Sequence, residues 1–224
     1  MYPTVKSALF DMDGLLLDTE IIYTQVTQAI VGDFGKVFDW SVKGNMIGRP
    51  ELDAATYLVE ALDLPIQPEE YLERRNGLLA KAFPTAKALP GAERLIRHLH
   101  QHSIPIAIAT SSSLSMFDLK RTQHSSWFDL FDTVVTSDHP QVEKGKPAPD
   151  LFNVAASLIG AEACSSLVFE DAPSGLAAGI AANMPVVVVP DANMDKARYS
   201  EATLILDSLL DFKPEEFGLP AFKG

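Results

Sequence analysis

The chain has 224 residues, of which 47% are hydrophobic and 21% charged, as expected of one large globular domain or of one domain with a smaller insertion. The formal net charge of −12 argues against nucleic-acid binding, which needs clustered lysine and arginine, and the apolar runs are too short to span a membrane. The single cysteine, Cys164, excludes an internal disulfide and fits a reducing, cytoplasmic location.

The first predicted strand covers residues 5–10, and no convincing strand follows it before residue 104. Helical patterning fills the interval: apolar residues repeat over 52–62, and a second helix opens at Pro68 with two glutamates, as first turns prefer. A simple crossover between parallel strands does not need so many residues. The pattern therefore predicts a helical cap domain, residues 17–85, inserted into a core domain of residues 1–16 and 86–224.

Four further apolar runs predict strands that are covered on both faces, because they are continuously apolar and do not alternate. They cover residues 104–110, 133–136, 166–170 and 185–190, and helical repeats over 92–99, 152–159 and 176–181 alternate with them. We expect Asp150 to cap the second of these helices and Asn183 to end the third in a left-handed conformation. Strands that alternate with helices predict an α/β fold, a doubly wound parallel sheet.

Polar side chains follow the predicted strands at their carboxyl ends, where doubly wound sheets bind ligands. Asp11 and Asp13 follow the first strand, a Thr-Ser-Ser-Ser run at 110–113 follows the second, and Glu170-Asp171 ends the fourth. Lys146 lies between the third strand and its helix. Taken singly, each of these features is typical of a turn or a helix cap, but their convergence on one edge of the sheet favours a site.

The acidic run that begins at Asp11 could in principle be a calcium loop. An EF-hand requires oxygen ligands at its fifth position, glycine at its sixth and glutamate at its twelfth. Those positions hold Leu15, Leu16 and Ile22, which excludes the EF-hand.

Asp11 and Asp13 share one face of an extended segment, because side chains alternate along it. Together with Asp171 they would form a hard, oxygen-rich site that suits Mg²⁺. A carboxylate can also act as a nucleophile, with its neighbour as general acid and base. Lys146 and the metal would then supply the positive charge that phosphoryl transfer requires and that this acidic chain otherwise lacks.

Four segments in this order carry a resemblance to a known family: DMDGLLLDTE at 11–20, ATSS at 109–112, GKPAPD at 145–150 and FEDAPSG at 169–175. The chain resembles the haloacid dehalogenase-like (HAD) hydrolase superfamily, in the subfamily I branch with a helical cap. Within it, residues 108–112, 167–173, 188–191 and 202–220 are similar to pseudouridine-5'-phosphatase-like proteins. The resemblance implies a Rossmann-like core with an inserted helical cap.

The resemblance also implies catalytic roles. Asp11 would be the nucleophile that becomes phosphorylated, and Asp13 the general acid and base. Thr110, the backbone N–H of Ser111 and Lys146 would bind the phosphate, and Asp150 would orient Lys146. A Mg²⁺ ion would be held by Asp11, the backbone carbonyl of Asp13 and Asp171, with Glu170 near the ion or acting through water.

Substrate choice is expected to reside in the cap, where Gly48 and Arg49 match the specificity loop of the family. Arg49 would offer a forked donor to a hydroxyl or a second phosphate; alternatively, it is a surface arginine before a loop proline. The second aspartate, Asp13, is missing from dehalogenases that resemble this fold. The related β-phosphoglucomutases carry a cap histidine where this chain has Tyr23.

These features together favour a Mg²⁺-dependent phosphatase that acts through an aspartyl-phosphate. Its partner would be a small phosphorylated metabolite, either pseudouridine 5'-phosphate or a sugar or polyol phosphate, with no nucleic-acid or membrane partner. We expect a cytoplasmic monomer. The alternatives are a sugar phosphomutase of the β-phosphoglucomutase type and a catalytically silent binding protein.

Overall fold

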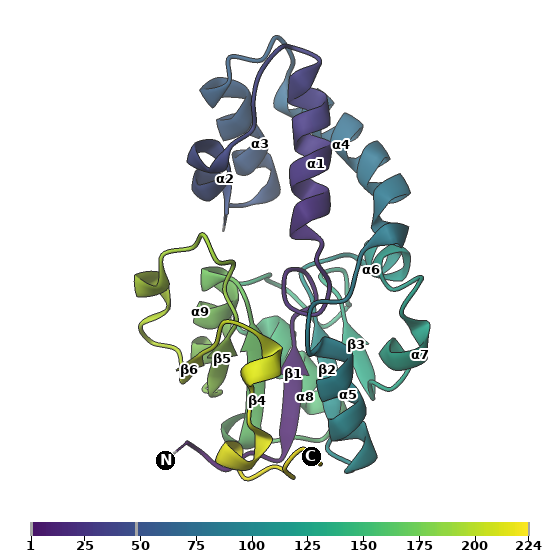
Figure 1. The fold of residues 1–224 in the computed structure, drawn as a ribbon, viewed down its shortest axis with the longest axis vertical. Coiled ribbons are helices and arrows are strands. Elements are labelled where there is room, and N and C mark those ends of the chain that lie inside the picture. The colour runs from purple at the N-terminus through teal and green to yellow at the C-terminus, as the bar shows by residue number, and fades with distance from the viewer. Residues whose placement is uncertain (1, 48, 224) are drawn as a thin grey trace.

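A parallel six-stranded sheet, in the order β3-β2-β1-β4-β5-β6, forms the centre of the computed structural model, which describes residues 2–47 and 49–223 (Figure 1). The strands are β1 (Ser7–Phe10), β2 (Ile106–Ala109), β3 (Thr133–Val135), β4 (Ser166–Glu170), β5 (Val186–Val188) and β6 (Leu204–Ile205). The strand order reverses beside β1, between β2 and β4, which is where doubly wound sheets bind ligands. The predicted fold class is confirmed.

Helices cover both faces of the sheet, since neighbouring residues of each strand point into different cores. Phe10 packs in one core with α5 (Ala92–Gln101), α6 (Leu114–Lys120) and α7 (Ser125–Phe128). Leu9 packs in the other core with α8 (Asp150–Leu158) and α9 (Pro173–Ala181). Burial on both sides explains why the strands are continuously apolar in the sequence.

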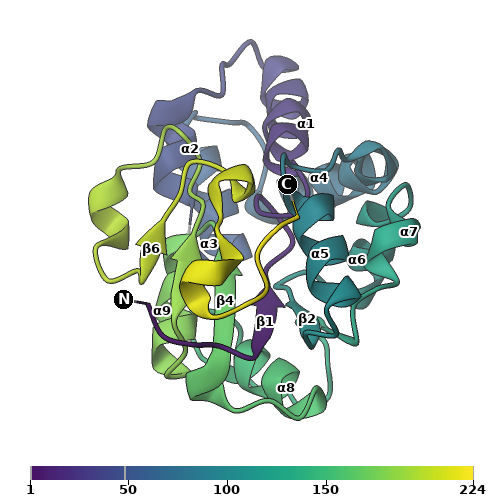
Figure 2. The same ribbon diagram turned by 60° about the horizontal axis from the view of Figure 1, so that its bottom comes forward.

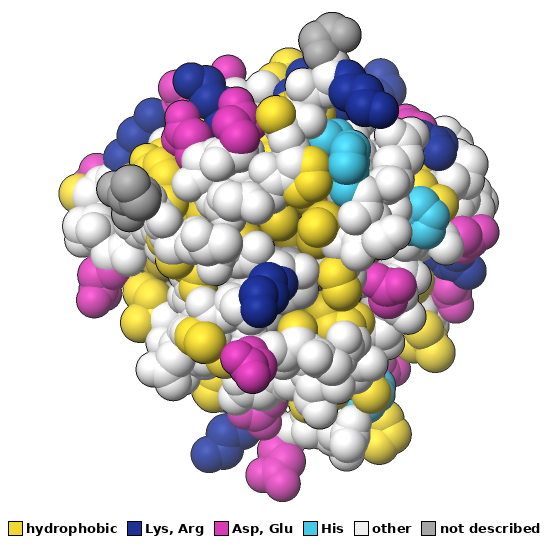
Figure 3. Space-filling model, turned by 90° about the horizontal axis from the view of Figure 1, so that it is seen from below, with side chains coloured by type: hydrophobic (Ala, Val, Ile, Leu, Met, Phe, Trp, Pro, Cys, Tyr) yellow, Lys and Arg dark blue, Asp and Glu magenta, His cyan; other side chains and the backbone are white. Residues whose placement is uncertain are grey.

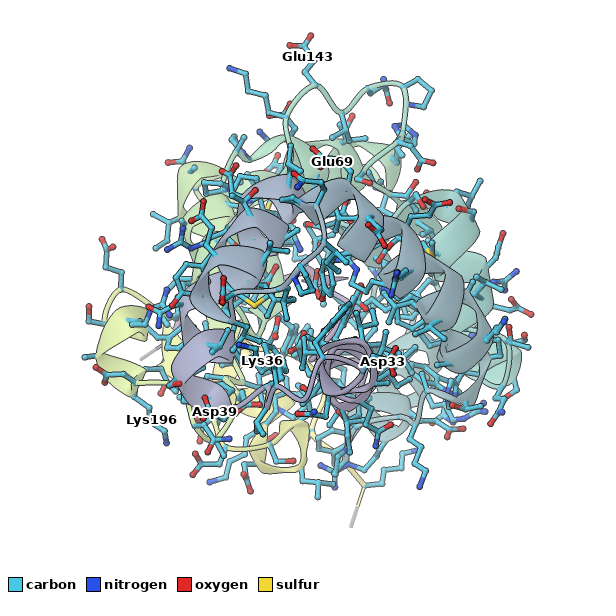
Figure 4. All side chains as sticks on the ribbon, turned by 90° about the horizontal axis from the view of Figure 1, so that it is seen from above. Asp33, Lys36, Asp39, Glu69, Glu143 and Lys196 are labelled. Atoms are coloured by element: carbon cyan, nitrogen blue, oxygen red, sulfur yellow. The ribbon has the colours of Figure 1, made fainter. Side chains whose placement is uncertain are left out.

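The four helices that we call the cap helices lie beyond the carboxyl ends of the strands (Figures 1 and 4). They are α1 (Glu20–Gly32), α2 (Trp40–Met46), α3 (Glu51–Ala61) and α4 (Pro68–Ala82), followed by the short 3-10 helix η1 (Phe83–Thr85). The carboxylate of Asp39 caps α2 by accepting the N–H of Ser41. Proline and two glutamates occupy the first turn of α4, as its sequence predicts.

The two connections between the cap helices and the sheet run side by side. Leu17 forms a bridge with Ala88, the N–H of Asp18 donates to Lys87 O at 2.8 Å, and the N–H of Leu89 donates to Leu16 O at 2.9 Å. Both ends of the inserted segment are therefore held together by backbone hydrogen bonds. The boundaries at residues 16/17 and 85/86 stay a prediction.

The two expected helix ends have different outcomes. Asn183 has the expected left-handed backbone, with φ of 58°, just beyond α9. Asp150 is not the N-cap of α8 but its first residue, after Pro149. Its carboxylate accepts the N–H groups of Glu143 and Lys144, so it fixes the loop that carries Lys146, and no hydrogen bond or ion pair joins it to that lysine.

The C-terminal segment completes the core on the α5 side of the sheet (Figure 2). It contains the 3-10 helices η4 (Leu209–Asp211) and η5 (Pro214–Phe217), and Phe212 packs edge-on against Phe169 of β4. On the side away from the cap helices, basic, acidic and apolar side chains are interspersed (Figure 3). Among the described residues, no helix combines the length and apolarity that crossing a membrane requires.

Candidate active site

Asp11 and Lys146 meet at the carboxyl end of β1. The Nζ of Lys146 donates to Asp11 Oδ1 at 2.5 Å, to Glu170 Oε1 at 2.6 Å and to the backbone oxygen of Ala109 at 2.9 Å. Three acceptors from three different strand ends thus use all three donors of one ammonium group. The structure brings together the predicted nucleophile and the predicted phosphate-binding lysine.

Asp11, Glu170 and Asp171 form an acidic cluster in which one carboxylate oxygen from each lies within 4.8 Å of the others. Burial raises the pKa of Asp11 to about 7, and the negative charges of Glu170 and Asp13 add to this effect, while Lys146 opposes it. Burial, followed by the charges of Glu170 and Asp11, also raises the pKa of Asp171 well above its ordinary value. Such crowding of carboxylates is relieved by a bound cation, and oxygen ligands of this kind suit Mg²⁺.

Two glycines allow this cluster to form. A Cβ atom on Gly175, in the first turn of α9, would lie 1.8 Å from the carboxyl carbon of Glu170. Gly14 has φ of +78°, and a Cβ atom there would lie 2.3 Å from Asp171 Oδ2. Both positions therefore require glycine for a close approach of a carboxylate to the backbone.

Asp13 has a separate set of partners. Its Oδ1 accepts hydrogen bonds from Thr19 Oγ1 at 2.7 Å and from Lys120 Nζ at 2.5 Å, and its Oδ2 accepts one from Ser112 Oγ at 2.9 Å. Burial alone would raise the pKa of Asp13, but the charge and hydrogen bond of Lys120, with the two hydroxyls, outweigh it and lower the pKa. Asp11 and Asp13, two residues apart, are thus perturbed in opposite directions.

Thr110 and Ser111 lie in the turn after β2. Thr110 is fully buried, and its hydroxyl accepts the N–H of Ser112 at 3.0 Å, which fixes the turn between β2 and α6. Ser111 is exposed at the same strand end. Their predicted phosphate contacts stay a prediction.

Of the two predicted specificity residues, the structure describes only Arg49. Gly48 lies outside the described residues. Arg49 is exposed, and its contacts in the structure are within the cap helices: its Nε donates to Asn45 O at 2.6 Å, and its guanidinium lies 4.8 Å from the ring centre of Tyr57. A substrate role for Arg49 therefore stays a prediction.

Sequence reasoning assigned no role to Thr19, Ser112 or Lys120, the three donors around Asp13. The two hydroxyls lie inside recognised motifs, so only their individual roles were missed. Lys120 lies outside the motifs, but it follows the buried Phe117 at helical spacing, and a lysine on the buried face of a helix is a signal that it has an ionic partner.

Fold, motif order and the cluster at the strand ends together define a class of enzyme. The sequence model of the haloacid dehalogenase-like hydrolase family matches residues 8–189. The chain therefore belongs to the haloacid dehalogenase-like hydrolase family.

Comparison with individual relatives indicates which kind of hydrolase the chain is. The chain is 46% identical to (DL)-glycerol-3-phosphatase 2 of Arabidopsis thaliana, over 98% of this chain and 94% of that protein. It is 45% identical to a probable pseudouridine-5'-phosphatase of Drosophila melanogaster, over 97% and 96%. Its structure resembles that of a HAD family hydrolase from Deinococcus radiodurans R1, solved with bound phosphate and sodium, with a TM-score of 0.82, 25% identity and coverage of 97% and 99%. The protein is thus an enzyme of the phosphatase type.

Proposed function

We propose that the protein is a Mg²⁺-dependent phosphatase that hydrolyses a small phosphomonoester through an aspartyl-phosphate on Asp11. The observation that carries this proposal is the contact of Asp11 with Lys146, beside an acidic cluster and two residues before Asp13. A carboxylate so placed has a phosphate-binding cation next to it and an acid/base group within reach on the same loop.

The first half-reaction transfers the phosphoryl group to the protein. A carboxylate oxygen of Asp11 attacks phosphorus while the bond from phosphorus to the leaving oxygen breaks, and Asp13 gives that oxygen a proton. Lys146, the Thr110 hydroxyl and the backbone N–H of Ser111 bind the phosphoryl oxygens and balance their charge.

The second half-reaction restores the carboxylate. Asp13 accepts a proton from a water molecule whose oxygen attacks phosphorus, and the bond between phosphorus and Asp11 breaks. Inorganic phosphate then leaves. Because Asp13 carries a proton in one direction and then in the other, its position relative to Asp11 matters in both steps.

The donor set fits a magnesium ion. Asp11, Asp171 and the backbone carbonyl of Asp13 would hold it, with Glu170 next to the ion or acting through water, and each is an oxygen ligand of the kind that Mg²⁺ prefers. When bound, the ion would offset negative charge on the phosphoryl group.

The cap helices would close the site. We propose that residues 17–85 form a cap domain on the core of residues 1–16 and 86–224, and that Gly48 and Arg49 contribute to substrate choice. The paired connections at Leu17 and Ala88 support this division, because both ends of the inserted segment meet at one place. Closure over the strand ends would exclude water during transfer.

The names of the relatives support two substrate classes, glycerol phosphates and pseudouridine 5'-phosphate. We propose that the substrate is a small phosphorylated metabolite of one of these kinds and that the enzyme works as a cytoplasmic monomer, in keeping with its single cysteine.

Phosphate release from glycerol 3-phosphate, pseudouridine 5'-phosphate and a set of hexose phosphates tests the proposal. Release is expected from at least one of them, EDTA is expected to abolish it and added Mg²⁺ to restore it, and Asp11→Asn is expected to remove it. Isomerisation of a hexose phosphate without release would indicate a mutase. No release from any of them would contradict the proposed substrate classes.

A further inference from the structure

Lys120 is a buried cation next to the proposed acid/base residue. It is the last residue of α6, its side chain is fully buried, and the roles proposed above do not use it. Burial of an ammonium group is costly unless its hydrogens are bonded to fixed acceptors. The partners of Lys120 therefore indicate what it does.

Two of those partners belong to the active site. The Nζ of Lys120 donates to Asp13 Oδ1 at 2.5 Å and to Ser112 Oγ at 2.7 Å. Ser112 in turn donates to Asp13 Oδ2 at 2.9 Å. Lys120 thus contacts one oxygen of the carboxylate directly and the donor of the other, so it fixes the rotation of the carboxylate as well as its position.

Aromatic rings close the remaining side of the ammonium group. The Nζ lies 4.4 Å from the ring centre of Phe83 in η1 and 5.6 Å from that of Tyr23 in α1. These two rings pack edge to face, with centres 5.4 Å apart. Cation–π contacts from the first cap helix and from η1, near the two ends of the inserted segment, therefore hold Lys120 in place.

The contacts distinguish the two oxygens of Asp13. A carboxylate oxygen offers two lone-pair positions. Those of Oδ1 accept from Thr19 and Lys120, whereas Oδ2 accepts from Ser112 alone among the contacts that the structure describes. Oδ2 therefore keeps one position for a further partner.

We propose that Lys120 is a positioning residue that acts through Asp13, by engaging Oδ1 and leaving Oδ2 as the oxygen that exchanges the proton. This inference rests on the proposed function. In the first half-reaction, the proton on Oδ2 passes to the leaving oxygen as its bond to phosphorus breaks and the bond from Asp11 to phosphorus forms. In the second, Oδ2 takes a proton from the attacking water as the bond from Asp11 to phosphorus breaks.

Dependence on the leaving group separates this role from a merely structural one. The alkoxide of glycerol 3-phosphate needs a proton to leave, whereas 4-nitrophenyl phosphate releases a stabilised phenolate that does not. Lys120→Met is expected to lower kcat/KM about a hundredfold on glycerol 3-phosphate and less than about tenfold on 4-nitrophenyl phosphate. Asp13→Asn is expected to discriminate in the same direction and at least as strongly.

Two further variants keep the test decisive. Lys120→Arg retains a cation beside Asp13 and therefore avoids an unpaired buried carboxylate; because its donors are displaced, it is expected to discriminate in the same direction but less. In the double variant Lys120→Met/Asp13→Asn, the lysine substitution is expected to add no further loss on glycerol 3-phosphate. Lys196→Met, at an exposed lysine paired with Asp207, is the matched control and is expected to behave as wild type (Figure 4).

The failures are distinguishable. Suppose that Asp13→Asn loses more activity on glycerol 3-phosphate than on 4-nitrophenyl phosphate, as expected. The inference about Lys120 is then overturned if the folded Lys120 variants lose equally on both substrates, or if the losses add in the double variant. If Asp13→Asn itself fails to discriminate, the acid role of Asp13 in the proposed function fails, and the inference fails with it.

Discussion

Two carboxylates of one short loop differ because of what surrounds them. Burial raises the pKa of Asp11 to about 7, with the nearby negative charges adding to it against the opposing charge of Lys146, whereas Asp13 is surrounded by donors that lower its pKa despite burial. The two carboxylates therefore differ in proton affinity although they are only two residues apart. Most of the contrast comes from residues outside the loop: Glu170 and Lys146 beside Asp11, and Thr19, Ser112 and Lys120 around Asp13.

The Glu170 carboxylate lies so close to Gly175 that adding one methyl group there tests whether this packing is needed. Gly175→Ala would place a Cβ atom on the Glu170 carboxylate, so we expect kcat/KM to fall about a hundredfold through displacement of the acidic cluster. Gly77→Ala, in α4 with open space around it, is the matched control and is expected to stabilise the protein by about 0.5–1 kcal/mol. Kinetics and thermal unfolding of both variants provide the check; wild-type activity in Gly175→Ala would refute the packing argument.

Elements differ in how far the sequence predicts them. Strands β1 to β5 are predictable because burial on both faces makes them continuously apolar. Strand β4 has the predicted bounds, and the other four are shorter than predicted, as at Pro105, which cannot donate to a neighbouring strand. Strand β6 has only two half-buried residues and leaves no such signal. The motif residues could be placed at strand ends, but the pairing of Lys120 with Asp13 joins positions 107 apart, which no periodicity reveals.

Arg49, which follows α2, provides a test of whether the cap helices contribute to substrate choice. Arg49→Ala is expected to lower kcat/KM about tenfold on the preferred metabolite and to have little effect on 4-nitrophenyl phosphate, because a charged hydrogen bond to the rest of the substrate would be lost. Arg74→Ala, an exposed arginine of α4 paired with Glu70, is the matched control. Equal losses on both substrates would show that Arg49 has no role in specificity.

The whole molecule is acidic, with a formal charge of −12, and yet an enzyme of this class binds an anion. We propose that this conflict is resolved locally: the ammonium groups of Lys146 and Lys120 are buried beside Asp11 and Asp13, shielded from the solvent that would screen them, and a bound Mg²⁺ would offset the charge of the acidic cluster. Because these ionisable groups are buried, the stability of the protein is expected to depend on pH.

Without metal, the raised pKa of Asp11 means that the folded protein binds a proton more tightly there than the unfolded chain does. The stabilisation from this tighter proton binding is therefore fully present below pH 3.8 and is lost as pH rises towards about 7. The free energy of unfolding falls over this range by at most about 1.4 kcal/mol per pH unit. In EDTA, Asp11→Asn should gain stability over wild type across this range. Denaturant unfolding measured from pH 4 to 8 would show it, with the exposed Asp33→Asn as control (Figure 4); a constant difference would contradict the account.

Phosphorylation of Asp11 is the central claim, and acid quenching during turnover tests it most directly. Wild type and Asp13→Asn, mixed with 4-nitrophenyl phosphate and Mg²⁺ and quenched on the millisecond scale, should each show a protein species heavier by one phosphoryl group, because the phenolate leaves without a proton from Asp13. The added mass should map to the peptide that contains Asp11, disappear with hydroxylamine, and be absent from Asp11→Asn. Full turnover in wild type with no phosphorylated protein at any time, or a phosphoryl group on another residue, would contradict the mechanism.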